Sequence, residues 1–221
     1  MKKRVTLLIL FAFLTIFFTA SIAQAATLLK VGSTGEEVKT LQAQLTALGY
    51  TPCIIDGIFG TKTKIAVQSF QTASGIASDG VVGPITRDAL TRAYNVNVRK
   101  SKTDGILATA NSLIGTPYLW GGSTPSGFDC SGFVQYVFAK NGITLPRISK
   151  EQYTVGTPIE FNSLQAGDLV FFSFNKDGVV SHDGIYIGNN QFINSSSSKG
   201  VTIYTMGTYW QSVYVGAKRV Y

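Results

Sequence analysis

Residues 128–140, FDCSGFVQYVFAK, form the stretch that decides the fold. After Cys130, apolar residues follow at the spacing of one helical face: Phe133, Val134, Val137 and Phe138. We therefore predict a helix from Cys130 to about Lys140, with the sulfur on the face that turns inward.

The segments on either side of this helix indicate the fold class. A helical pattern precedes it over residues 104–113, and a strand-rich pattern follows Pro146. The predicted strands cover residues 167–172, 182–187, 191–195, 201–204 and 214–220. Helices followed by an antiparallel run of strands predict an α+β fold.

The composition is that of a folded protein with one or two cores. Of the 221 residues, 45% are hydrophobic and only 14% are charged, which excludes a disordered chain. The formal net charge is +7, and three of these charges lie in residues 2–4. The remaining surplus favours loose attraction to anionic polymers. No dense basic run follows, so nucleic acid is not an expected partner.

The first 25 residues have the three parts of an export signal. Basic residues 2–4 are followed by an apolar run over residues 5–20 and by Ala23-Gln24-Ala25. We predict a signal peptide, residues 1–25, and a product that is secreted, extracellular or associated with the cell wall, with no membrane contact after cleavage. The alternative is an uncleaved anchor, but the run is shorter than the roughly 20 residues that span a bilayer.

Residues 28–93 are predicted to form a small helical domain. Ser33-Thr34-Gly35-Glu36 has the form of a capping box, and a helix is expected after it. Its apolar stripe consists of Val38, Leu41, Leu45 and Leu48, and Gly49 ends it. A second helix is predicted over residues 61–72 and a short third one from Pro84. The polar residues 94–103 are expected to be a linker to a second domain, 104–221.

The helical domain contains an internal repeat. Asp56-Gly57-Ile58-Phe59-Gly60 recurs 23 positions later as Asp79-Gly80-Val81-Val82-Gly83, and each copy precedes a predicted helix. Asp-Gly favours a turn, and the second glycine permits a tight entry to the helix. Taken alone, the repeat is as compatible with a purely structural role as with a functional one.

The two cysteines have different surroundings. A disulfide between Cys53 and Cys130 is one reading in an exported chain. Cys53, however, lies in an apolar, turn-like segment and is expected to pack, whereas Cys130 opens a helix. The helix dipole and free N–H groups there favour the thiolate and are expected to lower the pKa of the thiol, although Asp129 opposes this.

A thiolate nucleophile needs a proton shuttle, and His182 is the single histidine of the chain. Strand alternation places His182 and Gly184 on one face and Asp183 on the other. A three-residue loop, 188–190, would put Asn194 opposite Gly184 on the histidine's face. A two-residue loop would turn Asn194 to the opposite face.

Four motifs in this order resemble the NlpC-type cell-wall peptidases, a papain-like α+β family. They are Gly115–Gly122 (GTPYLWGG), Phe128–Gly132 (FDCSG), Gly167–Phe172 (GDLVFF) and His182–Gly188 (HDGIYIG). The resemblance implies that Cys130 is the nucleophile, His182 the base and acid, and Asn194 the residue that fixes the imidazole. It also implies that Tyr118 helps to line the oxyanion site and that Asp129 and Ser131 contact substrate.

The repeat of residues 28–93 resembles the three-helix peptidoglycan-binding domain. This resemblance implies a domain that holds the protein on its polymer, with turns built by Asp56, Gly57, Gly60, Asp79, Gly80 and Gly83.

Two residues depart from the commonest peptidase pattern. The position of Asn194 more often holds histidine, although asparagine serves the same purpose in papain-like enzymes. The residue after the histidine is usually small and apolar, but here it is Asp183. The sequence leaves open whether Asp183 is a solvent-facing strand end or a substrate contact.

The Cys/His pair and the resemblance together predict a peptidoglycan hydrolase, a cysteine endopeptidase of stem peptides. The resemblance implies that the cleaved bond lies between D-glutamate and the diamino acid. One alternative is an N-acetylmuramoyl-L-alanine amidase that uses the same Cys/His pair, and another is an inactive wall-binding protein. We expect peptidoglycan as partner, a monomer and no cofactor. No metal is expected, because one histidine and two distant cysteines do not make an ordinary zinc site.

Overall fold

The computed structural model describes residues 27–51 and 54–221. The predicted signal peptide and Cys53 therefore lie outside the described residues. Within those two ranges, no helix is both long enough and apolar enough to cross a membrane.

The helical unit at the N-terminal end contains the three expected helices. Helices α1 (Glu36–Ala47) and α2 (Thr61–Ala73) pack with the first turns of α3 (Pro84–Ser112). Their shared core consists of Leu29, Val38, Leu41, Leu45, Phe59, Ala66, Val67, Phe70, Val82 and Leu90. The predicted apolar stripe of α1 therefore faces this core, with Leu48 at its edge.

The predicted capping box at the start of α1 is wrong. The N-cap residue is Gly35, and no side chain caps the helix. The hydroxyl of Ser33 instead accepts a hydrogen bond from the Lys30 N–H, at 3.1 Å. The reason is that residues 30–33 form a turn of their own, which takes the serine away from the helix end.

The two copies of the repeat are built alike. Asp56 accepts hydrogen bonds from the Ile58 N–H and from the side chain of Gln42, both at 2.8 Å. In the second copy, Asp79 accepts them from the Val81 N–H and Gln71, at 2.8 and 2.9 Å. The four predicted turn glycines have matching roles in the two copies. Gly57 and Gly80 have φ of 78° and 72°. Gly60 and Gly83 are the N-cap residues of α2 and α3. A buried glutamine thus ties each turn to the preceding helix.

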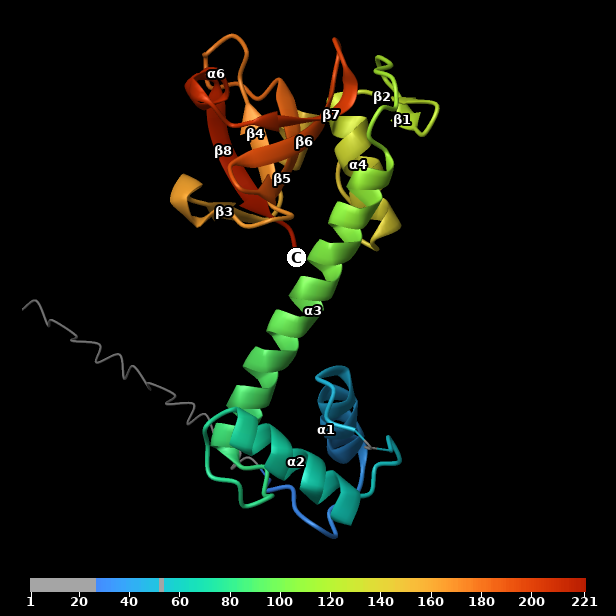
Figure 1. The fold of residues 1–221 in the computed structure, drawn as a ribbon, viewed down its shortest axis with the longest axis vertical. Coiled ribbons are helices and arrows are strands. Elements are labelled where there is room, and N and C mark those ends of the chain that lie inside the picture. The colour runs from blue at the N-terminus through green and yellow to red at the C-terminus, as the bar shows by residue number, and fades with distance from the viewer. Residues whose placement is uncertain (1–26, 52–53) are drawn as a thin grey trace, which may run out of the picture.

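Helix α3 is one continuous helix of 29 residues. The prediction of a short third helix is therefore wrong, since this helix and the one predicted over 104–113 are the two ends of α3. Residues 94–103 contain neither glycine nor proline, and Lys100 pairs with Asp104 one turn later, at 2.7 Å. The residues predicted as a linker thus form the middle of a rod about 43 Å long, which joins the two units in Figure 1.

The second unit is an antiparallel sheet of six strands in the order β3-β8-β4-β5-β6-β7. The strands are β3 (Thr157–Ile159), β4 (Leu169–Phe172), β5 (His182–Gly188), β6 (Gln191–Ser196), β7 (Gly200–Thr205) and β8 (Tyr214–Arg219). All five strands predicted in this region are present. The short β3 was not predicted, because three residues with a central proline carry little pattern.

Short elements complete this unit. They are β1 (Ser123–Thr124), β2 (Gly127–Phe128), α5 (Ser149–Gln152), the 3-10 helix η1 (Phe161–Ser163) and α6 (Thr208–Ser212). The predicted helix is present with its expected bounds as α4 (Cys130–Lys140). The α+β prediction is therefore confirmed.

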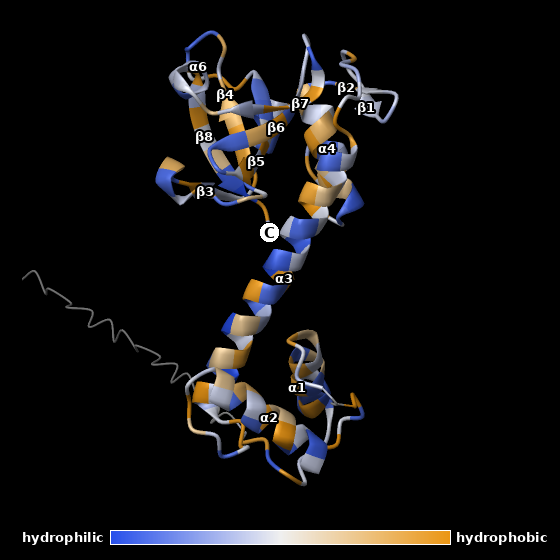
Figure 2. Ribbon diagram, in the orientation of Figure 1, coloured by the Kyte–Doolittle hydropathy of each residue, from blue (hydrophilic) through white to orange (hydrophobic). Residues whose placement is uncertain are grey.

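The sheet has a core on each face. On one face, α4 and the last turns of α3 pack against β4, β5 and β6 through Ile106, Phe133, Val137, Leu169 and Ile185. On the other, Phe172, Phe192 and Met206 form a smaller core beside α6. Figure 2 shows the hydrophobic residues gathered on β4, β8 and α4, while the middle of α3 is mostly hydrophilic.

Candidate active site

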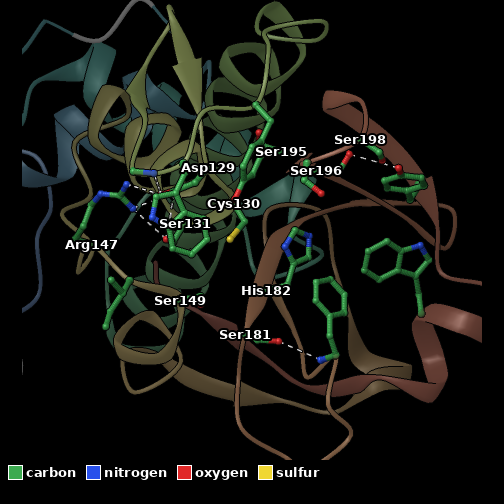
Figure 3. Close-up of a pocket in the computed structure, with 18 of the residues that line it drawn as sticks. Asp129, Cys130, Ser131, Arg147, Ser149, Ser181, His182, Ser195, Ser196 and Ser198 are labelled. Atoms are coloured by element: carbon green, nitrogen blue, oxygen red, sulfur yellow. Dashed lines mark hydrogen bonds and ion pairs between the residues drawn. The ribbon is translucent and has the colours of Figure 1, made fainter.

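An open pocket lies where the start of α4 meets the start of β5. It is lined by residues of several predicted motifs, among them Tyr118, Asp129, Cys130, Ser131 and His182. Figure 3 shows the side chains of Cys130 and His182 at this pocket, with the sulfur and the imidazole drawn near each other. The fold therefore brings together side chains that are 52 positions apart in the sequence.

Cys130 is the first residue of α4 and a free thiol, so it takes part in no disulfide. It is partly exposed, in contrast to the fully buried Phe133 and Val134 that follow on the same helical face. The helix thus buries its apolar side chains under the sheet and leaves its first side chain at the pocket.

His182 is oriented by Asn194. The Nε2 atom of the imidazole lies 3.1 Å from the amide oxygen of Asn194. Because an oxygen accepts, this bond places the ring proton on Nε2 and leaves Nδ1 unprotonated. Nδ1 is then the nitrogen free to accept a proton from the thiol.

The turn between β5 and β6 combines the two loop alternatives that the sequence left open. Asn189 and Asn190 have φ of 52° and 57° and form a two-residue hairpin turn. The register then shifts between Tyr186 and Gly188, which is a bulge. This extra residue compensates for the short turn, so Asn194 faces the same side as His182.

Two aromatic rings that contact each other pack against the imidazole of His182. Phe174 stacks on it at 5.1 Å between ring centroids, and Trp210 stacks on it at 5.8 Å, each with an interplanar angle of 27°. Burial lowers the pKa of His182 to about 4, against the opposing effect of the Asn194 hydrogen bond. The imidazole is therefore neutral near pH 7 and able to act as a base.

The predicted low pKa of the Cys130 thiol is wrong for the structure without substrate. Burial raises this pKa well above its ordinary range, and the carboxylates of Asp183 and Asp129 raise it further. The Ser131 N–H at the helix start acts in the expected direction but is outweighed. The helix dipole alone thus does not ionise the thiol, and His182 has to remove its proton.

Asp183 is fully buried, so it is not a solvent-facing strand end. It lies on β5 opposite Phe171, on the face that packs against α4. Neither of its carboxyl oxygens has a hydrogen-bond partner of good geometry. Asp183 and Cys130 are nevertheless close enough to affect each other's pKa.

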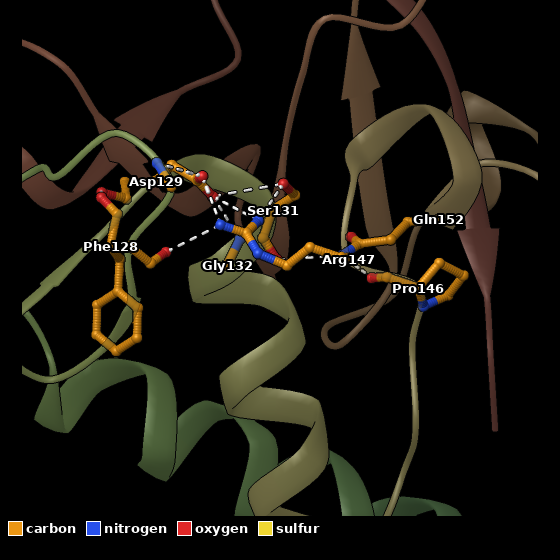
Figure 4. Close-up of polar contacts among 10 residues, drawn as sticks. Phe128, Asp129, Ser131, Gly132, Pro146, Arg147 and Gln152 are labelled. Atoms are coloured by element: carbon orange, nitrogen blue, oxygen red, sulfur yellow. Dashed lines mark hydrogen bonds and ion pairs between the residues drawn. The ribbon is translucent and has the colours of Figure 1, made fainter.

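Asp129 and Arg147 fasten the start of α4 (Figure 4). Asp129 is the N-cap residue and accepts a hydrogen bond from the Gly132 N–H at 2.7 Å. Arg147 donates to both carboxyl oxygens of Asp129, at 3.0 and 2.7 Å, and to the hydroxyl of Ser131 at 3.1 Å. These contacts hold the backbone next to Cys130. The substrate contacts implied for Asp129 and Ser131 stay predictions.

Tyr118 lines the same pocket and belongs to the loop that precedes β1. Burial raises the pKa of its hydroxyl, and the nearby Cys130 and Asp129 add to this effect. The hydroxyl is therefore a neutral hydrogen-bond donor near pH 7, as a role in the oxyanion site requires. That role itself stays a prediction.

Sequence reasoning missed several residues of the site and of the repeat. Arg147, Phe174 and Trp210 lie in segments without a strong pattern, and only the fold brings them to the pocket. Gln42 and Gln71 had a detectable signal, since each is a polar residue within an apolar helical stripe. Among the residues that the structure describes, no three His, Cys, Asp or Glu side chains are grouped to hold a metal ion.

Comparison with known proteins places the chain in a family. Residues 115–219 match the model of the NlpC/P60 family, and residues 34–90 match that of a putative peptidoglycan binding domain. The chain is 36% identical over 164 residues to a probable endopeptidase NlpC homolog of Haemophilus influenzae, covering 71% of this chain and 86% of that protein. The chain belongs to the NlpC/P60 family.

Other NlpC/P60 relatives are longer. A gamma-DL-glutamyl hydrolase of Bacillus subtilis is 44% identical over 122 residues, which are 52% of this chain and 29% of that protein. The chain thus spans less than a third of this relative. A crystal structure of an NlpC/P60 family protein from Bacillus cereus superposes with a TM-score of 0.51 and 36% identity, covering 53% of this chain and 39% of that one. The papain-like sheet and helix are those of this family.

Proposed function

We propose that this protein is a cysteine endopeptidase that hydrolyses stem peptides of peptidoglycan. The observation that carries the proposal is that Cys130 and His182 line one open pocket, while the buried Asn194 holds the imidazole. Membership in a family whose members include named endopeptidases supports the reaction class. The name of the Bacillus hydrolase supports cleavage of a γ-linked glutamyl bond, and in a stem peptide we assign this bond to the link between D-glutamate and the diamino acid.

The geometry supports a two-step hydrolysis. Nδ1 of His182 takes the proton from the Cys130 thiol while the sulfur attacks the peptide carbonyl carbon. The imidazolium then returns that proton to the leaving amine, and the C–N bond breaks to give a thioester. Water, deprotonated by the same nitrogen, attacks the thioester, and the thiol is regenerated. Asn194 holds the ring throughout through Nε2.

The oxyanion of each tetrahedral intermediate needs hydrogen-bond donors. The amide N–H of Cys130 belongs to the first turn of α4, where a helix leaves N–H groups without helical acceptors. The hydroxyl of Tyr118 is the second donor that we assign to this site. Together they would stabilise the charge that develops on the carbonyl oxygen.

We assign to the helical unit the role of binding the wall polymer. Its match to a putative peptidoglycan binding domain supports this role, and tethering would raise the local concentration of substrate. The signal pattern of residues 1–25 supports secretion to the wall or beyond. The division into residues 28–93, 94–103 and 104–221 and the monomeric state belong to the same proposal.

Substitution Cys130→Ala tests the proposed chemistry. We expect complete loss of release of fragments from purified peptidoglycan, because no other described side chain at the pocket supplies a thiolate. Mass spectrometry of the fragments from the unmodified protein should show a cut between D-glutamate and the diamino acid.

Exposed Thr154→Ala serves as the control variant, since Thr154 lies outside the pocket. Unchanged circular dichroism of Cys130→Ala would show that the fold is intact. Full activity of Cys130→Ala would refute the mechanism, and fragments cut at the glycan–peptide amide would refute the assigned bond.

A further inference from the structure

Asp183 is an exception to the rule that buried polar groups are satisfied. Its side chain is fully buried, and neither carboxyl oxygen has a hydrogen-bond partner of good geometry. Such a group costs free energy, most of all when it is charged. The other buried acid among the described residues, Asp168, is paired and receives two hydrogen bonds from Arg219, at 2.7 and 2.8 Å.

The position of Asp183 directs this carboxyl toward Cys130. The residue lies at the start of β5, on the same face as Ile185, and that face packs against α4. Cys130 lies at the start of α4, on the face whose Phe133 and Val134 contact the same core. The start of α4 and the start of β5 therefore lie next to each other, whereas the side chain of His182 points to the other face of β5.

The surroundings of Asp183 provide little to neutralise its charge. From α4 and its N-cap it faces the Cys130 thiol, whose S–H stabilises the charged carboxylate, and the carboxylate of Asp129, which opposes that charge. The cation of Arg147 acts on Asp183 more weakly than Asp129 does. The neighbour on β4 is the apolar Phe171. On β6 the same face carries Ser195, whose hydroxyl donates to the carbonyl of Phe128 at 2.8 Å.

We propose that Asp183 is a proton-controlled brake on Cys130: the protonated carboxyl lets the thiol ionise, and the charged carboxyl holds it neutral. The inference rests on the proposed function, because the brake matters only if Cys130 is the nucleophile. Asp183 acts through Cys130 and touches no substrate, so it is a positioning residue.

The sign of the effect follows from the charges. Burial raises the pKa of Asp183 to about 7, so the carboxyl is neutral in mildly acidic solution and charged in alkaline solution. A negative charge beside the sulfur raises the pKa of the thiol and lowers the thiolate fraction. The brake is therefore released below about pH 7 and applied above it.

The test measures alkylation of Cys130 by iodoacetamide as a function of pH, in the unmodified protein and in the near-isosteric variant Asp183→Asn. We expect the ratio of rate constants, variant over unmodified, to be near one below about pH 5 and to rise to about tenfold above about pH 8. Asp183→Val, which removes the charge without adding hydrogen-bond donors, should give the same profile and replaces the asparagine variant if that one does not fold.

Asp104→Asn is the control, because it makes the same change of charge at an exposed position on α3. Its ratio should stay at one at every pH. A ratio that is independent of pH in both Asp183 variants, or one that falls below one, would overturn the brake. Hydrolysis of purified wall is measured on the same samples: a rising alkylation ratio without any hydrolysis by the unmodified protein would contradict the proposed function and leave the brake standing.

Discussion

At the scale of single residues, the site depends on how one imidazole is held. Asn194 fixes its Nε2 atom at 3.1 Å, and Phe174 and Trp210, which also contact each other, pack against the ring. These contacts leave Nδ1 as the free nitrogen. A ring held in this way does not need to reorient when it takes a proton. Pre-positioned groups lower the activation barrier of a reaction for this reason.

The role of Asn194 can be tested by substitution. We expect Asn194→Ala to lower kcat/KM on a soluble stem-peptide fragment by about a hundredfold, because the ring loses its orientation. Asn194→His should retain most of the activity, since an imidazole nitrogen can accept the same hydrogen bond. Equal activity of the alanine variant and the unmodified protein would show that the aromatic rings alone orient His182.

At the scale of elements, one ion pair joins the neighbouring strands β4 and β8 where β4 begins and β8 ends. Asp168 directly precedes β4 and is 1% exposed, and Arg219 ends β8 with 17% of its side chain exposed. The guanidinium donates to both carboxyl oxygens. Strand β4 carries the core under the site and pairs with β5, which carries His182.

Substitution Arg219→Gln should lower the free energy of unfolding by about 3–5 kcal/mol, because it leaves the buried charge of Asp168 without its partner. Urea denaturation measures this change. The double variant Asp168→Asn, Arg219→Gln removes both charges and should recover part of the loss. A loss below about 1 kcal/mol in the single variant would mean that water reaches Asp168.

The position of α4 depends on a close approach between its backbone and that of the loop before β1, in addition to the contacts of Asp129 and Arg147. A Cβ atom at Gly132 would lie against the backbone carbonyl of Gly122, well inside contact distance. Only glycine therefore lets the loop before β1 lie against the first turn of the helix. This loop carries one wall of the pocket, including Tyr118 and Trp120.

At the scale of the whole molecule, two separate cores share one helix. The core of the helical unit ends at Leu90, and that of the sheet unit begins at Ile106. Between them α3 has no buried residue. Contacts from Arg99 to Gln165 and from Thr103 to Tyr221, both at 2.8 Å, fasten the middle of α3 to the sheet unit.

This arrangement predicts a local effect for Val96→Pro, in the exposed middle of α3. Proline there costs about 3 kcal/mol of local helix stability, so helical circular dichroism should fall. Both cores lie away from Val96, so thermal unfolding and cleavage of a soluble stem-peptide fragment should stay as in the control Val96→Ala. Loss of cleavage in the proline variant alone would show that the two units cooperate through the helix.

The sequence by itself determined the features that depend on local order along the chain. The periodicity of residues 130–140 predicts α4 with its bounds, the apolar runs predict five of the strands, and a single histidine leaves one candidate for the base. The motifs in their order indicate the family. Each of these signals is carried by residues close together in the chain, where side-chain periodicity follows directly from helix and strand geometry.

Only the tertiary structure decided the features that depend on distant segments. The bulge after Tyr186 sets the face of Asn194, and burial at the junction of α4 and β5 raises the pKa of both Cys130 and Asp183. Residues 94–103 join their neighbours into one helix because the fragments on both sides are anchored in cores. The physical reason is that desolvation and packing are sums over all neighbours in space, and these neighbours come from parts of the chain that no local pattern connects.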